Sequence, residues 1–261
     1  MRLTRFHAVV AATLLGAALI VVLCSGPWRL LWLSLLFTSS GACLGLGVSF
    51  PHWQLFGRSL CRVQTDRKLV ALTFDDGPDP NSTPALLDLL ARRNIHATFF
   101  CVGERIARQS ELGRRIAAEG HAIENHSHRH QFWTNLLTEE KLEADLVLAQ
   151  QEILRVSGRT PAWFRPPMGL TNPRVFRVAR RLGLGIAGYT ARSLDLRADG
   201  SGRVVARLRR GLQPGAILLL HDGGVPAARL TATVTALMDT LQAEGYHCVR
   251  LDELVSDGAK S

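Results

Sequence analysis

The sequence of 261 residues predicts an α/β domain of parallel strands, preceded by two apolar helices that form a membrane hairpin. Segments with strand and helix patterns alternate from Lys68 onward, and repeated β-α units give parallel strands closed by helices. The run Ala216–Leu220 is apolar throughout, which suits a parallel strand buried on both faces. Residues 1–57, in contrast, contain three arginines and no acidic residue.

The N-terminal region holds two uncharged apolar stretches, at residues 8–24 and 30–50. Each approaches the roughly 20 residues that a spanning helix requires. Residues 1–57 are therefore expected to form a membrane anchor with two transmembrane helices. Arg2 and Arg5 before an apolar run also occur in secretory signals, but no small-x-small cleavage site follows.

The side of the membrane on which the main domain lies depends on whether both stretches span. Basic residues flank the two stretches, at Arg2, Arg5, Arg29, Arg58, Arg62, Arg67 and Lys68. In a bacterial-type inner membrane, the positive-inside bias favours a hairpin with both ends in the cytoplasm. A single span would place the domain outside, so the side stays open, with the cytoplasm favoured.

The formal net charge is +9, and arginine-rich stretches such as residues 203–210 contribute much of it. A solvated basic face explains this charge without any specific partner. Among specific partners, anionic membrane lipid suits an anchored protein best. No nucleic-acid motif is present, and nucleic acid is not an expected partner. The five cysteines form no CxxC pair, so no disulfide framework is expected.

A linker is expected at residues 58–67, a main domain at 68–255 and a loose tail at 256–261. Strands are predicted at residues 69–74, 97–102, 121–124, 162–164, 185–190, 216–220 and 247–251. Helices are predicted at residues 85–93, 110–119, 138–156, 173–182, 203–211 and 231–244. Thr138 is a natural N-cap for the longest of these helices.

Three glycines, Gly183, Gly185 and Gly188, match the GxGxxG dinucleotide fingerprint. Here the motif follows a predicted helix and enters a strand, whereas the fingerprint requires the strand first and the helix after it. No nucleotide cofactor is expected.

Acidic and histidine clusters follow two of the predicted strands. Asp75 and Asp76 come after the first strand, and His126 and His130 lie four residues apart. If the histidines share one face of a helical turn, both reach one cation, and one aspartate supplies a third ligand. The other aspartate then remains as a base beside an activated water. Either motif alone is equally explained as a turn or as surface histidines, but together, after strands, they indicate a catalytic metal site.

Three more segments complete a set of five motifs: Arg165-Pro166-Pro167-Met168-Gly169, Ser193-Leu194-Asp195-Leu196 and Leu218-Leu219-Leu220-His221-Asp222. With them, residues 66–255 resemble the NodB-type polysaccharide deacetylases, carbohydrate esterase family 4. The resemblance implies a distorted (β/α) barrel. It also implies metal-dependent removal of an acetyl group, or of a formyl group, from an amino sugar.

The resemblance assigns the central roles. A divalent ion, usually Zn²⁺ with Co²⁺, Mn²⁺ or Ni²⁺ as alternatives, would be held by Asp76, His126 and His130. Asp75 would be the general base. His221 would be the general acid that protonates the departing sugar amine.

Supporting roles follow in the same way. The backbone N–H of Met168 would stabilise the oxyanion. Arg165 would pin Asp75, and Asp195 would orient Arg165, although an Arg–Asp pair is also a common buried salt bridge.

The implied substrate pocket includes Pro166 and Leu219, although core packing alone also explains a leucine in this strand. Two positions depart from the usual family pattern. Met168 stands where the family often has Tyr, and Leu196 stands where a Trp commonly follows the motif aspartate. These departures predict a weaker aromatic platform for the sugar.

The expected substrate is an amino-sugar glycan or glycolipid. A cytoplasmic domain favours a lipid-linked glycan, and an outward-facing one favours peptidoglycan or an exported polysaccharide. Two other functions stay open. One is an O-acetyl carbohydrate esterase, which would depend less on His221 because an alkoxide leaves more readily than an amine. The other is a catalytically silent glycan-binding membrane protein, against which the complete residue set argues.

Overall fold

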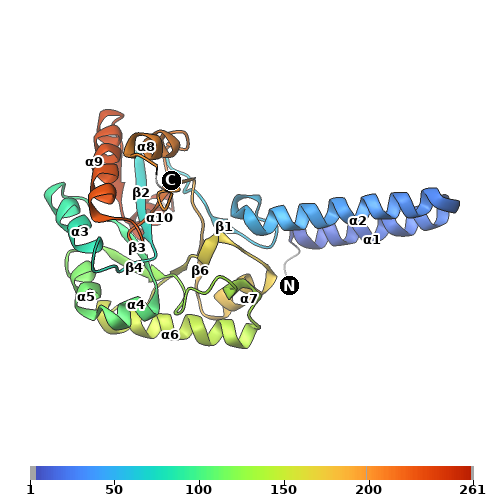
Figure 1. Ribbon diagram of the computed structural model, residues 1–261, viewed down its shortest axis with the longest axis horizontal. Helices are drawn as coiled ribbons and strands as arrows, with labels where there is room; N and C mark the ends of the chain where they lie inside the picture. The colour runs from blue at the N-terminus through green and yellow to red at the C-terminus, as the bar shows by residue number, and fades with distance from the viewer. Residues whose placement is uncertain (1–3, 198, 260–261) are drawn as a thin grey trace.

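The computed structural model describes residues 4–197 and 199–259. A long helical hairpin projects from one side of an α/β domain (Figure 1). The strands are β1 Ser59–Leu60, β2 Leu69–Asp75, β3 Thr98–Cys101, β4 Ala122–Asn125, β5 Trp163–Phe164, β6 Gly185–Ala187, β7 Ala191–Arg192, β8 Ala216–His221 and β9 His247–Val249. The α-helices are α1 Arg5–Leu23, α2 Gly26–Ser49, α3 Thr83–Arg92, α4 Gly103–Arg108, α5 Ser110–Ala118, α6 Glu139–Ser157, α7 Pro173–Arg181, α8 Ser201–Arg209, α9 Ala227–Ala243 and α10 Leu251–Gly258. Short 3₁₀ turns are η1 Pro51–Trp53, η2 Thr134–Leu136 and η3 Pro167–Gly169.

The strands form one curved sheet in the order β1-β6-β5-β4-β3-β2-β8-β7, with β9 beside the start of β2. Neighbouring strands run parallel. After β1 the chain crosses to β8, where Arg62 forms an antiparallel bridge with Ala216, and the N–H of Val63 donates to Gly215 O at 3.0 Å. These contacts close the sheet into a distorted barrel, as predicted.

The main core lies between the sheet and the helices on its outer face. Buried residues of β2, β3 and β8 pack against α3, α8 and α9 there, and Phe74 stacks on Phe99 with ring centroids 5.2 Å apart. Every residue of β2 is buried, so this strand is covered on both faces. Burial of apolar surface stabilises the folded state by about 25 cal/mol per Å². The strand lies between β3 and β8 in the sheet, where both of its faces are covered.

The structure contains four elements that the sequence patterns do not predict: β1, β7, α4 and α10. Strands of two residues are too short to show an alternating pattern. Helix α10 covers residues 251–258, because Leu251 and Leu254 share one buried face. The predicted tail at 256–261 is therefore helical as far as residue 258, and residues 260 and 261 lie outside the described part. The predicted N-cap is confirmed, since Thr138 Oγ1 accepts from Lys141 N–H at 3.4 Å.

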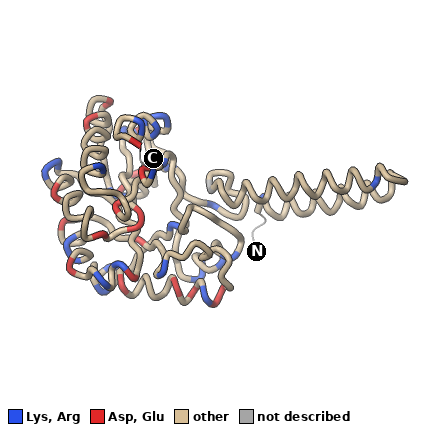
Figure 2. The backbone as a smooth tube through the Cα atoms, viewed as in Figure 1, with Lys and Arg blue, Asp and Glu red and all other residues tan. Residues whose placement is uncertain are grey.

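Helices α1 and α2 form the hairpin, and Thr13 Oγ1 lies 2.8 Å from Ser40 Oγ between them. Both helices are long and apolar enough to cross a membrane. No residue of α1 is buried, and only Gly47 of α2 is, so they are not core helices of the domain. Figure 2 shows the hairpin almost free of charged residues, in contrast to the domain. The hairpin is suited to act as a membrane anchor or signal.

The base of the hairpin is hydrogen-bonded to the segments that enter and border the domain. Phe6 N–H donates to Leu55 O at 2.8 Å. Thr171 N–H, in the loop before α7, donates to Val48 O at 3.1 Å. Both ends of the hairpin therefore lie beside the domain, and β1, inside the segment expected as a linker, pairs with β6.

Candidate active site

A cavity of about 270 Å³ opens at the carboxyl ends of the central strands. Asp75, Asp76, His126, His130 and His221 line it. They come from the ends of β2, β4 and β8, where ligands bind in parallel α/β folds. The predicted motifs therefore converge on one place.

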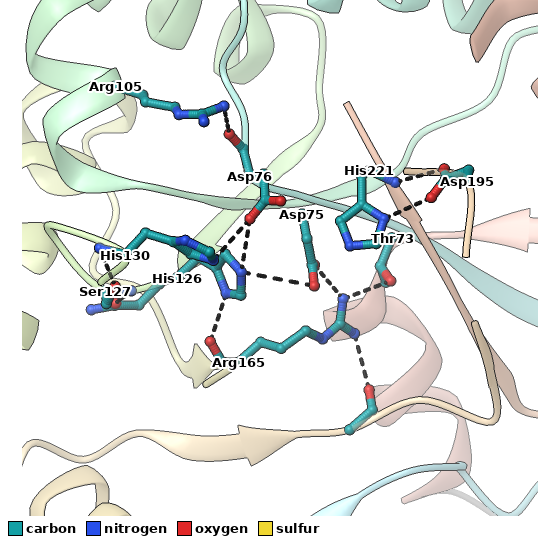
Figure 3. Close-up of polar contacts among 12 residues, drawn as sticks. Thr73, Asp75, Asp76, Arg105, His126, Ser127, His130, Arg165, Asp195 and His221 are labelled. Atoms are coloured by element: carbon teal, nitrogen blue, oxygen red, sulfur yellow. Dashed lines mark hydrogen bonds and ion pairs between the residues drawn. The ribbon is translucent and has the colours of Figure 1, made fainter. Parts of the chain in front are cut away.

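The two adjacent carboxylates point in different directions. Asp75 is the last residue of β2, and its N–H and C=O remain in the ladder with β8 beside His221. Asp76 adopts a left-handed backbone conformation with φ 71°, and its carbonyl accepts from the Arg105 guanidinium of α4. This turn directs Asp76 to the histidines and leaves Asp75 facing Arg165 (Figure 3).

Asp76, His126 and His130 bring their ligand atoms within 4.8 Å of one another. Asp76 Oδ1 lies 3.3 Å from His126 Nε2 and 3.0 Å from His130 Nε2. This oxygen is buried and has no hydrogen bond of good geometry within the described part of the chain. Burial alone would raise the Asp76 pKa, but the two imidazoles outweigh it and lower the pKa well below its usual range. One carboxylate oxygen and two imidazole nitrogens converging in this way fit a divalent metal.

The histidine loop is not the helical turn that the spacing suggested. Residues 126–130 form an irregular loop in which Ser127 and His130 have positive φ angles of 66° and 50°. Asp145 of α6 holds this loop by accepting from the N–H groups of His128 and Arg129 at 2.8 and 3.3 Å. The two imidazoles thus converge because α6 and β4 shape the loop.

The tautomer of His126 is set by its neighbour. His126 Nδ1 lies 2.6 Å from the carbonyl oxygen of Arg165. A carbonyl only accepts, so Nδ1 carries the proton and Nε2 presents its lone pair toward Asp76. A backbone carbonyl on the second nitrogen is the usual partner of a metal-binding histidine.

Arg165 is fully buried in the middle of the barrel. Its Nη1 donates to Asp75 Oδ1 at 2.6 Å and to Thr73 Oγ1 at 2.9 Å, and its Nη2 donates to Gly188 O at 3.0 Å. The guanidinium also lies over the Phe100 ring, 3.9 Å from the centroid. The expected Arg165–Asp75 contact is therefore present.

Asp195 does not orient Arg165, contrary to expectation. It lies on His221 instead, where Oδ1 accepts from the ring Nδ1–H at 2.7 Å and Oδ2 accepts from the backbone N–H at 3.0 Å. Burial would lower the His221 pKa, but the bond to Asp195 and the charges of Asp75 and Asp76 outweigh it and raise the pKa. Asp195 thus positions an imidazole and favours its protonated form.

The turn at η3 presents one backbone N–H to the cavity. Met168 has a left-handed φ of 61°, and in the described residues its N–H has no hydrogen-bond acceptor. Leu219 lines the cavity, as expected. Pro166 does not line it: this residue is buried beneath the turn, where its carbonyl accepts from Gly169 N–H at 3.0 Å.

Six further residues line the cavity that the sequence did not assign to the site: Gly169, Tyr189, Arg192, Leu194, Leu196 and Arg197. Tyr189 supplies an aromatic ring to the cavity, whereas the sequence predicted a weaker aromatic platform because Met168 and Leu196 replace the usual aromatic residues. Its position two residues beyond β6 was the available signal, because the other site residues also follow strand ends.

The geometry is that of a candidate site for one metal ion, with an arginine-held carboxylate on one side and an aspartate-held imidazole on the other. The chain matches the polysaccharide deacetylase family over residues 62–187. The chain belongs to this family. The sequence resemblance and the expected fold are thereby confirmed.

Curated relatives and solved structures match about two thirds to three quarters of the chain. A peptidoglycan-N-acetylglucosamine deacetylase of Bacillus cereus is 35% identical over 195 residues, which is 74% of this chain and 91% of the relative. A chitooligosaccharide deacetylase of a Bradyrhizobium species is 36% identical over 181 residues, 68% of this chain and 81% of the relative. Among solved structures, a family 4 acetyl xylan esterase of Clostridium thermocellum with a cobalt ion has a TM-score of 0.66 and 32% identity, covering 72% of this chain and 90% of that one.

Proposed function

We propose that this enzyme removes the acetyl group from an N-acetylglucosamine residue of a glycan such as peptidoglycan or a chitooligosaccharide. One observation carries the proposal. Asp75 has one oxygen on Arg165, and its other oxygen lies 4.0 Å from His126 Nε2, at the edge of the candidate metal cluster. A held carboxylate beside such a cluster is suited to take a proton from an attacking water. The names of the two curated relatives, a peptidoglycan-N-acetylglucosamine deacetylase and a chitooligosaccharide deacetylase, support N-acetylglucosamine as the sugar.

Asp76, His126 and His130 would hold the metal. A bound divalent cation would supply Lewis-acid polarisation of the amide carbonyl and raise the acidity of water. The donor set of two imidazoles and one carboxylate suits Zn²⁺, with Co²⁺, Mn²⁺ and Ni²⁺ as alternatives. The cobalt ion in the family 4 esterase supports the view that such a site accepts divalent ions other than Zn²⁺.

Asp75 acts as the general base. Its carboxylate accepts the proton of the water whose oxygen attacks the acetamide carbon. Arg165 holds one oxygen of this carboxylate, so the other is directed to the cavity. Positioned proton transfer of this kind contributes about 10²–10⁴-fold to the rate.

His221 acts as the general acid. Because Asp195 accepts from Nδ1, the second ring nitrogen is left to carry a proton toward the cavity. As the C–N bond breaks, this proton passes to the sugar nitrogen, and the products are acetate and a free amine. The N–H of Met168, which has no acceptor in the described chain, donates to the oxyanion of the tetrahedral intermediate.

A second candidate is hydrolysis of an O-acetyl ester at the same site. The similarity to an acetyl xylan esterase favours this alternative. The leaving alkoxide needs less help from an acid, so His221→Ala is expected to reduce ester hydrolysis less than amide hydrolysis.

The test is release of acetate and formate by the detergent-purified protein, with and without a chelator. The substrates are N-acetylated chitooligosaccharides, peptidoglycan and acetylated xylan. Acetate from an N-acetylated glycan that stops with chelator and returns with Zn²⁺ supports the proposal. Formate would assign a deformylase, and acetate from xylan alone would favour the esterase. No release from any substrate would contradict hydrolysis altogether.

We further propose that residues 1–57 anchor the enzyme in a membrane as a hairpin, with both ends on the side of the domain. Cys24 lies at the turn between α1 and α2, and Cys61 lies beside β1 at the base. Single-cysteine variants retaining Cys24 or Cys61 are expected to react with a membrane-impermeant maleimide from opposite sides of sealed vesicles. Labelling of both from one side would contradict the hairpin.

A further inference from the structure

A second cavity of about 550 Å³ lies next to the catalytic one. The two share Tyr189, Arg192 and Leu194 in their walls. The second cavity extends to Phe50 and His52, at the end of α2. The two cavities are therefore neighbours, and together they extend from the base of the hairpin to the candidate metal cluster. We call the second cavity the arginine groove.

The arginine groove is lined by four arginines, Arg62, Arg192, Arg207 and Arg210, and by no Asp or Glu. Only Arg207 is neutralised, by Asp199 at 2.6 Å. Within residues 4–197 and 199–259, Arg192 and Arg210 take part in no ion pair, and the Arg62 side chain donates only to the carbonyl of Pro214. Three of the four arginines of this groove therefore meet no carboxylate within the described residues, and their positive charge is concentrated along this one groove.

The mouth of the arginine groove lies at the level where the hairpin emerges. Phe50 and Trp53 stack there, with ring centroids 5.9 Å apart, and remain 39% and 38% exposed. Aromatic residues at the end of a spanning helix mark the interface between membrane and water. Strand β1, which precedes Arg62, lies beside this base (Figure 1).

The unpaired arginines of the groove favour an anionic ligand. Uncharged N-acetylglucosamine polymers carry no group that would compensate several arginines. A phosphate or diphosphate does, because its oxygens match the guanidinium fork and form charge-assisted hydrogen bonds. A cation-lined groove that begins at the membrane and ends at the amide-cleaving residues suits an amino sugar linked through phosphate to a lipid.

We infer that the arginine groove binds the phosphate or diphosphate of a lipid-linked N-acylated amino sugar, and so places the acyl group in the catalytic cavity. This inference rests on the proposed deacetylase function and narrows its substrate class. Arg62, Arg192 and Arg210 are the residues that hold the phosphate. The lipid chain remains in the membrane beside Phe50.

The experiment compares kcat/KM of the full-length protein in detergent micelles for three probes that share one sugar. The probes are polyprenyl-diphosphate N-acetylglucosamine, UDP-N-acetylglucosamine and chitotetraose. The wild type is expected to prefer the lipid-linked probe. In the double variant Arg62→Gln/Arg210→Gln, this preference is expected to fall about tenfold for each arginine removed, which corresponds to the loss of one charge-assisted hydrogen bond. The matched control is Arg92→Gln/Arg159→Gln, which removes the same charge from exposed arginines elsewhere.

The outcomes separate the inference from the proposed function. Deacetylation of chitotetraose at the same efficiency as the lipid-linked probe, with no effect of the groove variant on their ratio, would overturn the inference while leaving the activity intact. Equal kcat/KM for UDP-N-acetylglucosamine and the lipid-linked probe would contradict the claim that the substrate is linked to a lipid. An equal loss of preference in the control variant would show that the effect depends on net charge alone, and it would contradict phosphate binding in the arginine groove. Inactivity on all probes would instead contradict the proposed function.

Discussion

Arg165 donates from Nη1 to Oδ1 of Asp75 at 2.6 Å, and both side chains are almost completely buried (Figure 3). The pair lies between the middle of the barrel and the catalytic cavity, and bulk water reaches little of either side chain. Removal of one partner of such a pair leaves an uncompensated charge in the interior. The same contact therefore serves both the candidate chemistry and the stability of the fold.

Arg165→Met is expected to lower the free energy of unfolding by about 3–5 kcal/mol and to abolish turnover. Urea unfolding followed by tryptophan fluorescence measures the first effect. The double variant Arg165→Met/Asp75→Asn should recover part of the stability, since the unpaired carboxylate is gone, but no activity. If the two substitutions simply add, the residues are not coupled and the paired-charge account is wrong.

Asp75→Asn is expected to retain metal and to lose about 10²–10⁴-fold in kcat, because the amide has no proton-accepting carboxylate. His126→Ala is expected to lose both metal and activity. Metal content by atomic emission, measured beside acetate release, separates these two results. Substantial activity in Asp75→Asn would sink the base assignment.

Asp195→Asn is expected to shift the basic limb of the kcat/KM profile to lower pH. The carboxylate of Asp195 helps to raise the pKa of His221 above its ordinary 6.5, so its removal lowers that pKa. The protonated acid is then lost at a lower pH. A raised pKa in the folded state also stabilises the fold fully below about pH 6.5, and this contribution is lost as pH rises through the folded pKa. An unchanged basic limb would show that another group is the acid.

Glu124 of β4 gives a separate pH test, remote from the chemistry. Burial raises its pKa to about 8, although the N–H groups of Trp163 and Ala162 donate to Oε2 at 2.7 and 2.9 Å and lower it. The folded state thus binds this proton more tightly than the unfolded chain, whose value is near 4.5. Stability should therefore fall as pH rises from 4.5 toward 8, by at most about 1.4 kcal/mol per unit. Unfolding free energies of wild type and Glu124→Gln, measured across this range, should differ in slope, and parallel curves would contradict the raised pKa.

The alternation of strands and helices was sufficient to predict the α/β fold, and the place of the motifs after strands was sufficient to predict that they converge. The choice of Asp76 over Asp75 as the candidate ligand came from the family resemblance, and the structure brings Asp76, His126 and His130 together. The pairing of Asp195 with His221 was not predictable. It depends on β7 lying beside β8, and β7 has two residues and no pattern of its own. The histidine loop misled for a related reason: a spacing of four suggests a helical turn, but Ser127 and His130 adopt positive φ angles because α6 and β4 hold the loop. Local patterns carry no information on such long-range restraints.

The short connection between hairpin and domain has a mechanical consequence. Residues 59 and 60 are a strand of the sheet, Val63 is hydrogen-bonded to Gly215, and Arg5 Nη1 donates to Trp53 O at 2.8 Å. These contacts hold the base of the hairpin against the domain. With the hairpin inserted, the catalytic cavity would work at one fixed height above the bilayer, and sugars beyond that height would stay out of reach however well they matched the site.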